Sequence, residues 1–594
     1  MDRSSITKWL LLGLAIFLFW QYGRKAIGIG PTANEHQPIV LLADATAPVA
    51  SERVPEQVCR IETGDFKAEL STRGASLQQF VLKNGNYYST NEKDPYDRNG
   101  KMDLVTTPSE GRRPLRTDLR SPDAAAAQQT PFDDLDWKLD ANDATSCTFT
   151  HVDATTSLTK VVRSTGKPYE LEVDLKVQNL AAEPKKHRLS FEQSSYIKKK
   201  DIEAGFMRRQ SEHTTETMSS AGDKTERQAP SDFDPDAFKK KEFTSEGWRR
   251  TPGDARFSAV STSYFTKLAI PIAGPAVPAS ETRIEDRWDA TRFKERSADP
   301  DLGHIYRARL AYPERELKPQ ESVEYKVLTY NGPKERDLLK AVGHSTTDAL
   351  NLGTFALIAN VLVVYLKWLF HLTGSWGVAI ILMTISVKTL LFPLSLTQIK
   401  SSIAMRKLKP EMDALNEKYK DDATQRGLAT QELWKKNGIT NPVLGCLPML
   451  LQMPIWWALY SALQTAIEVY HVSFGPFIPD LASPGKYFII PIVLGASSFM
   501  QQRMMPAQGD AQQQKMMMYM MPAVFTFMML FLPAGLGVYM LTNTWLGIGQ
   551  QLLVERYLKA KTASPGVIEV REKTEGGGGK PTSTLGKGKA RVRG

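Results

Sequence analysis

One apolar stretch of the sequence contains a basic residue whose position suggests a function. Residues 377–396, GVAIILMTISVKTLLFPLSL, are long enough to cross a bilayer, yet Lys388 lies well inside them. A cation at the bilayer centre costs about 2.5–3.5 kcal/mol on insertion scales, so it normally faces a bundle interior or water. Thr384 lies four residues earlier and shares the same helical face. This pattern predicts a polar, partly hydrated surface between helices.

Snorkelling and ion pairing are two alternative roles that the sequence leaves open for Lys388. The end of the apolar run is two turns away, roughly 12 Å at ~1.5 Å per residue, so snorkelling to the interface would strain the side chain. Ion pairing needs a buried carboxylate, but the apolar runs themselves contain no Asp or Glu, and Glu468 lies at the opposite end of its run. A lysine without such a partner implies water, or a partner that comes from outside the protein.

Other polar residues lie within the later apolar runs and could share that surface. Tyr539 and Asn543 are four residues apart and lie on one helical face. Gln452 and Gln464 lie in an earlier run, and Thr542 and Thr544 flank Asn543. The stretch 501–530, QQRMMPAQGDAQQQKMMMYMMPAVFTFMML, is dense in methionine. Such a run indicates either side chains that pack against other helices or face lipid, or an adaptable surface that binds varied apolar ligands.

The sequence contains no motif for covalent catalysis or nucleotide use. There is no G-x-S-x-G or H-E-x-x-H, and GGGGK ending at Lys580 lacks a preceding strand and is followed by Pro581 instead of Ser or Thr. No His/Cys cluster has metal-ligand spacing. We therefore expect no enzymatic activity, no metal and no cofactor. Cys59 and Cys147 could pair in an oxidising compartment, but the sequence leaves their pairing open.

The elements that position these residues fall into two halves. The chain has 594 residues and a net charge of +10; residues 52–347 are polar and residues 350–553 mostly apolar. Residues 1–25 predict either the apolar region of a signal peptide or an uncleaved transmembrane anchor; Arg24 and Lys25, which follow the apolar run in place of a cleavage site, favour the anchor. Residues 26–56 predict a linker. Period-two alternation in 171–180, 187–197 and 322–332 predicts antiparallel strands, so 57–345 should form an all-β sandwich. The charged segment 211–250 should be a long loop or an insertion.

The apolar half predicts five more spans, so the fold class is a polytopic α-helical membrane protein with six transmembrane helices and a periplasmic all-β sandwich. We expect an interfacial amphipathic helix at 348–374, followed by spans at 375–396, 441–469, 487–505, 516–532 and 536–554. The connections are a helical hairpin at 397–440, broken by DDAT and Gly427, a short outer loop at 470–486, a loop at 506–515 and a basic tail at 555–594. The positive-inside rule places the hairpin in the cytoplasm. Six spans with the N-terminus inside then put the loop at 506–515 and the tail on the same side, although the charges that flank the first span are balanced.

Several runs of this sequence resemble a known family. ISVKTLLFPL, NPVLGCLPMLLQMPIWWALY, FLPAGLGVYMLTNTW and GQQLLVERYLK are similar to signature runs of the YidC/Alb/Oxa family of membrane protein insertases. SYFTKLAIP and YNGPK resemble pieces of the large outer domain of its Gram-negative members. The resemblance covers nearly the whole chain. It implies a multi-pass protein of the bacterial inner membrane that inserts and folds other membrane proteins without a nucleotide.

The resemblance also implies roles for particular residues. In the family, a hydrophilic groove open to the cytoplasm and to lipid carries a positive charge that attracts the polar outer segment of a client. Here the groove would contain Lys388, Thr384, Gln452, Tyr539 and Asn543. A hydrophobic slide for the client helix would contain Met449, Trp456, Phe527 and Met528, and the substrate-receiving cytoplasmic hairpin would contain Met405, Arg406 and Lys407. The usual groove residue is arginine, so Lys388 is a departure that keeps the charge but loses the five-donor fork.

Partners are implied by the same resemblance and by the charge of the tail. We expect nascent membrane proteins as clients, with or without the Sec translocon. The basic tail favours binding to anionic lipids. It also favours binding to the ribosome and the signal recognition machinery, through phosphate groups rather than through a specific nucleic acid sequence. Two rival classes are a secondary transporter or channel with Lys388 at an ion site, and a sugar- or peptide-binding sandwich tethered to the membrane. No internal repeat typical of transporters is present.

Overall fold

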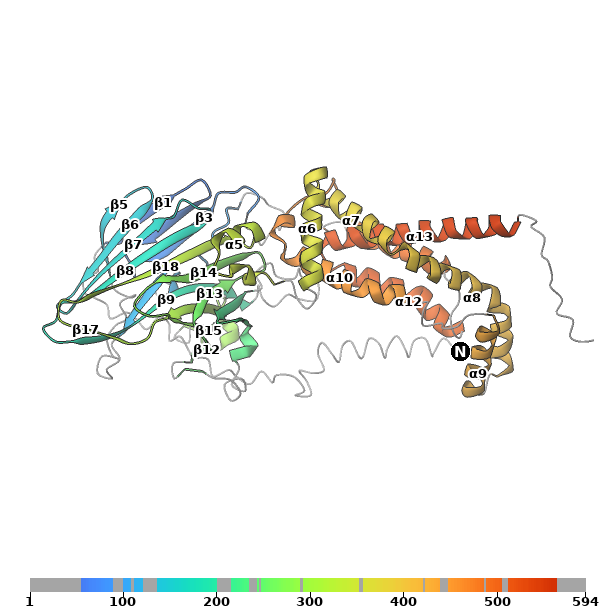
Figure 1. Ribbon diagram of the computed structural model, residues 1–594, viewed down its shortest axis with the longest axis horizontal. Helices are drawn as coiled ribbons and strands as arrows, with labels where there is room; N and C mark the ends of the chain where they lie inside the picture. Colours follow the sequence, from blue (N-terminus) through green and yellow to red (C-terminus); the bar gives the residue numbers. More distant parts are fainter. Residues whose placement is uncertain are drawn as a thin grey trace, which may run out of the picture.

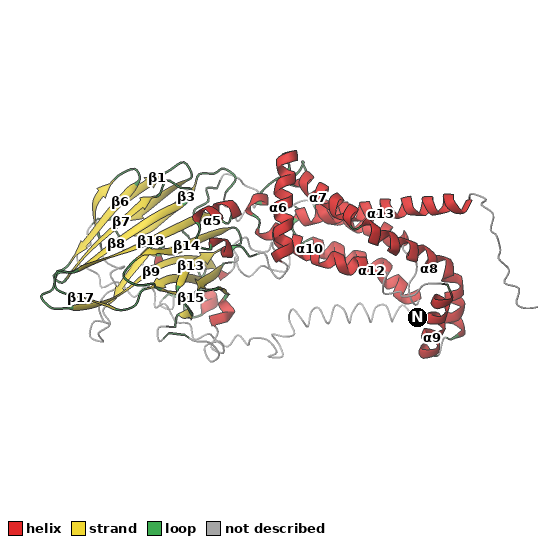
Figure 2. Ribbon diagram, in the orientation of Figure 1, coloured by secondary structure: helices red, strands yellow, loops and turns green. Residues whose placement is uncertain are grey.

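Strands and helices occupy separate lobes of the molecule (Figures 1 and 2). The computed structural model describes residues 55–88, 100–107, 112–120, 136–199, 215–233, 243–244, 247–288, 292–351, 356–419, 422–437, 447–485, 488–504 and 511–563. The predicted anchor at 1–25, nearly all of the linker at 26–56 and most of the tail at 555–594 lie outside these residues. The described residues form the two lobes and a segment that joins them.

Three antiparallel sheets build the strand lobe. A three-stranded sheet, in the order β1-β2-β3, comprises β1 (Val58–Glu62), β2 (Phe66–Ser71) and β3 (Ser76–Leu82). A nine-stranded sheet, in the order β11-β10-β13-β14-β18-β8-β7-β6-β5, comprises β5 (Lys138–Asn142), β6 (Ser146–Val152), β7 (Thr156–Ser164), β8 (Glu170–Asn179), β10 (Glu216–Ala221), β11 (Lys224–Gln228), β13 (Ala255–Ser261), β14 (Phe265–Ala273) and β18 (Ser322–Pro333). A six-stranded sheet has the order β12-β15-β16-β9-β17, with β4 also paired to β9; it comprises β4 (Arg116–Arg120), β9 (Lys185–Lys198), β12 (Arg249–Thr251), β15 (Ala279–Arg287), β16 (Gly303–Ala311) and β17 (Arg315–Leu317).

The sheets pack on a common apolar core, as the alternating sequence pattern predicts. Strand β7 alternates buried and partly buried positions, and β8 continues the pattern, so one face of each points inward. The predicted strands at 171–180, 187–197 and 322–332 are confirmed as β8, β9 and β18. The prediction of a long loop at 211–250 is wrong at β10 and β11. Strand β10 is rich in small polar residues. The buried Ser219 hydroxyl donates to the carbonyl and the hydroxyl oxygen of Ser280, so it is not left without a hydrogen bond.

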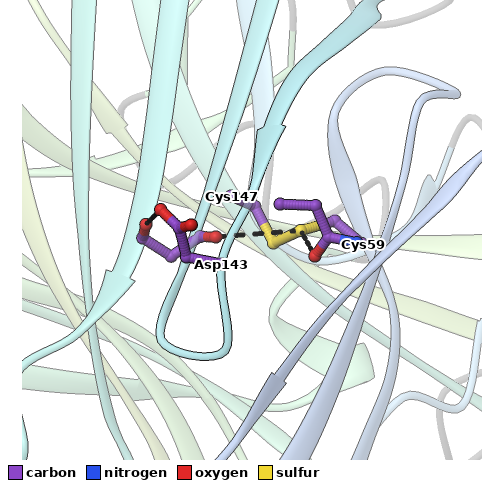
Figure 3. Close-up of a disulfide and its surroundings, with 5 residues drawn as sticks. Cys59, Asp143 and Cys147 are labelled. Carbon is purple, nitrogen blue, oxygen red and sulfur yellow. Dashed lines mark hydrogen bonds between the residues drawn. A yellow bond between two sulfur atoms is a disulfide. The ribbon is translucent and has the colours of Figure 1, made fainter.

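A disulfide joins the small sheet to the large one. Cys59 of β1 bonds to Cys147 of β6, with the two Cα atoms 6.0 Å apart (Figure 3). The bond lies beside the turn between β5 and β6, where the Ser146 hydroxyl donates to Asp143 over 3.2 Å. Both cysteines are fully buried. The pairing that the sequence left open is therefore made, as expected for a domain in an oxidising compartment.

Two buried lysines should make the stability of the strand lobe depend on pH. Lys160 donates to the carbonyl of Leu115 over 2.6 Å, and Lys267 donates to the carbonyl of Leu104 over 2.8 Å. Burial lowers the pKa of each amine from 10.5 to about 7. The folded lobe therefore releases these protons near neutral pH, whereas the unfolded chain keeps them until about pH 10.5. Stability should rise between these values, by at most about 1.4 kcal/mol per pH unit for each lysine.

This expectation can be measured on the full chain in detergent. The free energy of unfolding of the strand lobe should rise more steeply from pH 7 to pH 9 in the parent protein than in Lys160→Met or Lys267→Met. Lys224→Met, at an exposed strand end, is the control and should keep the parent slope. Equal slopes in all four proteins would show that the buried amines stay charged in the folded lobe.

The helical lobe begins after a short link. The link contains α5 (Arg336–Val342) and a 3-10 turn, η7 (Thr346–Ala349). The helices of the lobe are α6 (Ala356–Thr373), α7 (Trp376–Leu390), α8 (Phe392–Lys418), α9 (Ala423–Lys436), α10 (Leu447–Thr465), α11 (Ile489–Met504), α12 (Ala511–Met529) and α13 (Ala534–Ala563), with a further 3-10 turn, η9 (Ile467–Val469), after α10. Two further 3-10 turns, η5 (Pro230–Phe233) and η6 (Arg296–Ala298), lie in the strand lobe.

Helix α6 lies across the ends of the other helices, between the two lobes (Figure 1). It ends at Gly374, whose φ of 67° is the left-handed value that lets the chain leave a helix and turn back. Phe370 then stacks on Trp376 at the start of α7, with ring centroids 4.3 Å apart. Among the described residues, α6 is the single helix both long and apolar enough to cross a membrane, and α7 with α8 to Leu415 would count as one broken span bent by 62°.

The predicted apolar helices exist, but several boundaries differ. The run 375–396 is broken at Leu391, because Pro393 lies in the first turn of α8, where its missing N–H is tolerated. Two helices, α8 and α9, occupy the range of the predicted hairpin; α8 ends at Lys418, α9 begins at Ala423, and Gly427 lies inside α9. Helix α12 starts at Ala511, inside the predicted loop at 506–515. Helix α13 continues to Ala563, past the predicted end at 554.

Candidate functional site

Lys388 lies in the last turn of α7, directly before the bend into α8. Its side chain is partly buried and reaches toward Gly547 of α13. If Gly547 carried a methyl group, that group would lie 3.9 Å from the Lys388 Nζ atom. The same methyl group would lie 2.9 Å from Nε2 of Gln501 on α11. Lys388 therefore faces the place where α7, α11 and α13 meet. In the part of the chain that the structure describes, it forms no ion pair and no hydrogen bond.

Gly547 and Gln501 are site residues that the sequence analysis did not select. Glycine at 547 leaves room for the Gln501 amide, which would have to shift if a Cβ stood there. Gln501 occurs in the polar QQR end of a predicted span, which resembles an ordinary interfacial end. Neither residue could be assigned to Lys388 without the packing of the three helices.

Thr384 shares the face of Lys388 but lies deeper. Its side chain is 1 % exposed, and its hydroxyl donates to the carbonyl of Ile380 over 2.7 Å. Met383 and Ile380 beside it belong to the apolar core of the helical lobe. The structure thus places Thr384 at the inner end of the polar surface, with its proton already used within its own helix.

Tyr539 and Gln452 are brought together by α13 and α10. The Gln452 side-chain amide donates to the Tyr539 hydroxyl, and Tyr539 is 1 % exposed. Asn543 lies one turn further along α13, toward Lys388, and its Oδ1 atom is buried without a hydrogen-bond partner among the described residues. A buried unsatisfied acceptor costs about 1–3 kcal/mol, which marks this face of α13 as a polar surface rather than ordinary apolar packing.

The predicted slide residues differ in exposure. Phe527 of α12 is exposed and contacts Phe531 edge-on, while Met528 is only partly exposed. Trp456 of α10 stacks on Tyr460 and packs against the core of the helical lobe. The exposed apolar residues of α10 are its neighbours Met453 and Trp457. The side chain of Met449 lies outside the described part of the structure.

The three hairpin residues have separate environments. Met405 is buried with Leu408 against Trp434 of α9, which holds the two hairpin helices together. Lys407 is exposed. Arg406 turns away from the hairpin and contacts Glu555 of α13 over 3.0 Å and the carbonyl of Met504 at the end of α11.

The end of the helical lobe that faces the strand lobe is covered by the α10–α11 loop, residues 466–485. Phe474 of this loop lies on Gly377 of α7, where a methyl group would come within 2.1 Å of the ring. The backbone N–H groups at the start of α13 donate to the loop, Gly535 to Leu481 and Ala534 to Ser483, each over 2.8 Å. The loop thus ties α7 and α13 together and closes this end of the bundle.

The same loop is anchored in the strand lobe. Tyr470 belongs to the core of that lobe, and its hydroxyl donates to the carbonyl of Tyr88 over 3.0 Å. Its neighbour His471 stacks on Tyr88 with ring centroids 4.2 Å apart. Glu468 forms an ion pair of 2.7 Å with Lys367 of α6. This junction was not predicted, because its partners are far apart in the sequence.

The chain matches known proteins over nearly its whole described length. The family model for the YidC periplasmic domain matches residues 58–365, and the model for the 60Kd inner membrane protein matches residues 368–561. The membrane protein insertase YidC of Anaeromyxobacter sp. (strain Fw109-5) is 32% identical over 519 residues, which are 86% of each chain. The membrane protein insertase YidC of Geobacter sulfurreducens is 42% identical over 257 residues, 43% of this chain and 48% of that protein.

A solved structure adds to these relatives. The crystal structure of an active YidC insertase with its first transmembrane domain resolved aligns with 85% of this chain and 93% of its own, at 17% identity and a TM-score of 0.35. The two family models meet within α6, so that the first covers the strand lobe and most of α6 and the second covers the rest of the helical lobe. The chain belongs to the YidC family of inner-membrane protein insertases, with a periplasmic β domain.

Proposed function

We propose that this protein inserts nascent membrane proteins into the bacterial inner membrane and that Lys388 receives the polar outer segment of the client. The observation that carries the proposal is the setting of Lys388 where α7, α11 and α13 meet, without a carboxylate partner among the described residues. An unpaired cation held in a partly buried surface attracts a passing acidic group more strongly than one in water. The client supplies the partner that the protein lacks.

The energy for insertion comes from the client and the membrane. Each methylene group of the client that enters lipid contributes about 0.8 kcal/mol. A negative charge that moves outward across a potential of 100 mV gains about 2.3 kcal/mol. The protein lowers the barrier for the polar segment, and no covalent step is needed. The exposed apolar residues of α10 and α12, among them Trp457 and Phe527, give the apolar helix of the client a path into lipid.

The topology of the proposal has six spans with both termini in the cytoplasm. The spans are the anchor at 1–25, the α7 run, α10, α11, α12 and the first part of α13. Helix α6 lies in the outer interface, supported by its course across the other helices (Figure 1) and by its exposed apolar face at Leu357, Val361 and Trp368. The Sec translocon, anionic lipids, and the ribosome with its signal recognition machinery are the partners of this arrangement.

Purified protein in sealed liposomes tests the function. Client proteins should insert without any nucleotide, and ions or small solutes should not cross the bilayer when no client is present. Solute flux in the absence of a client, without insertion activity, would instead favour a transporter or channel with Lys388 at an ion site.

Deletion of residues 52–345 should leave most of the insertion activity. The α10–α11 loop keeps its contacts to Gly377, Ala534 and Gly535 without the strand lobe, so the outer end of the bundle stays closed. The deletion exposes Tyr470, which we expect to lower the thermal stability of the helical lobe by a few degrees. Complementation of cells depleted of their own insertase measures the first effect.

A deletion variant that also carries Tyr470→Ser is the matched control for the exposed aromatic ring. Loss of complementation in both variants, with normal membrane levels, would mean that the strand lobe takes part in the function and would favour a tethered binding domain.

A further inference from the structure

A contact outside the groove joins three helices on the cytoplasmic side of Lys388. Arg406 of α8 forms an ion pair of 3.0 Å with Glu555 of α13 and donates to the carbonyl of Met504. Gln551 of α13 donates to the same carbonyl over 2.7 Å and lies 3.4 Å from Glu555. Met504 ends α11, so its free carbonyl carries the negative end of the helix dipole, which attracts the guanidinium group. We call this contact the Arg406 clasp.

The clasp lies on the same helix faces as the groove, further toward the cytoplasm. Gly547, Gln551 and Glu555 follow one another at intervals of four residues and therefore share one face of α13. Glu555 is two turns, roughly 12 Å, beyond Gly547 at ~1.5 Å per residue. On α11, Gln501 beside Lys388 precedes Met504 by three residues. A polar segment that enters from the cytoplasmic hairpin therefore passes the clasp before it reaches Lys388.

The clasp is built so that it can open. Arg406 is 40% exposed and Glu555 is 17% exposed in their side chains, and an ion pair in contact with water contributes little to stability. Met405 and Leu408, beside Arg406, pack within the hairpin against Trp434 of α9. The hairpin can thus move away from α13 without losing its own apolar contacts. Arg406 also presents a planar fork that binds any carboxylate in the way it binds Glu555.

We propose that Arg406 is a positioning residue that receives the acidic segment of a client before Lys388 does. In the resting protein, Glu555 occupies Arg406 and holds the base of the hairpin against α11 and α13. A client carboxylate displaces Glu555, the hairpin moves, and the segment continues along α13 to Lys388. This inference rests on the proposed insertase function and adds to it a selection for clients with acidic outer segments at the entrance.

The test compares two clients that differ only in the charge of the outer segment, one with aspartates and one with asparagines in the same places. Insertion rates are measured in liposomes with the full chain. Arg406→Gln should slow the acidic client at least threefold and leave the neutral client unchanged. Glu555→Gln should speed the acidic client, because Arg406 is then free, and Arg406→Lys should keep the preference for the acidic client.

The double exchange Arg406→Glu with Glu555→Arg separates this role from a merely structural clasp. It restores an ion pair between α8 and α13 but places a negative charge on the hairpin. The inference predicts that the acidic client stays slow while the neutral client inserts at the parent rate. Recovery of the acidic client, equal slowing of both clients by Arg406→Gln, or no gain with Glu555→Gln would each overturn it. Insertion of the neutral client by the parent protein tests the insertase function separately.

Discussion

Lys388→Glu is expected to reduce insertion of acidic clients at least tenfold. Two unit charges 4 Å apart interact by about 4 kcal/mol at an effective dielectric constant of 20, and the substitution turns this attraction into repulsion. A loss of only about 1.4 kcal/mol of this attraction would already slow insertion tenfold. The glutamate would also lie near Gly547 and Gln501, whose side-chain amide is neutral. Complementation in depleted cells and insertion rates in liposomes measure the loss.

Two further variants show that the loss comes from the groove charge. Lys388→Arg should retain function, because arginine keeps the cation. Lys400→Glu, on an exposed face of α8, changes the net charge by the same amount and should have little effect. Full complementation by Lys388→Glu would remove the groove charge from the mechanism.

Cys59→Ser or Cys147→Ser is expected to destabilise the strand lobe by about 2–5 kcal/mol, the usual effect of removing a native disulfide that closes a long loop. The bond spans 88 residues of sequence and joins the three-stranded sheet to the nine-stranded sheet, so its loss frees the small sheet first. Unfolding of the full chain in detergent, followed by strand-lobe fluorescence, gives the difference in free energy.

Two controls accompany the cysteine variants. Cys446→Ser removes a cysteine from the membrane half and should leave the strand lobe as stable as in the parent protein. Reduction of the parent protein should reproduce the effect of Cys59→Ser. If the cysteine variants and the parent protein unfold at the same denaturant concentration, the bond does not form in the membrane-inserted protein.

Strands with alternating burial could be predicted from the sequence, whereas strands with polar interiors could not. Residues 171–180 alternate because β8 has one face in the core. Strand β10 carries Ser219 and Thr217, which resemble loop residues until Ser280 and Gln228 are placed opposite them as hydrogen-bond partners. Local composition does not reveal a partner that is about 60 residues away.

Only part of the site could be predicted, because some of its residues are defined by neighbours that are distant in the sequence. Lys388 could be found because an ionisable residue in an apolar run is energetically unusual by itself. Gln501 and Gly547 are ordinary residues in their own helices and become site residues only through the packing of α11 and α13 against α7. Lys367 and Glu468 likewise form an ion pair that joins α6 to the α10–α11 loop, although 101 positions separate them.

The bend after Lys388 illustrates a further limit of sequence patterns. Hydropathy runs through residues 377–396 without a break, so the run predicts one span. The structure ends α7 at Leu390 and turns by 62° into α8. This bend places Lys388 in the last turn of a helix, directly before the first helix of the hairpin.

Crosslinking from the groove to a stalled client tests the central claim most directly. A photoreactive amino acid is placed at position 388, and separately at Gln501, which leaves the Lys388 charge intact. Leu372, on the exposed face of α6, serves as the control position. The account predicts that both groove positions crosslink to the polar outer segment of a half-inserted client and that position 372 does not. Crosslinks to that segment from position 372 but from neither groove position would contradict it.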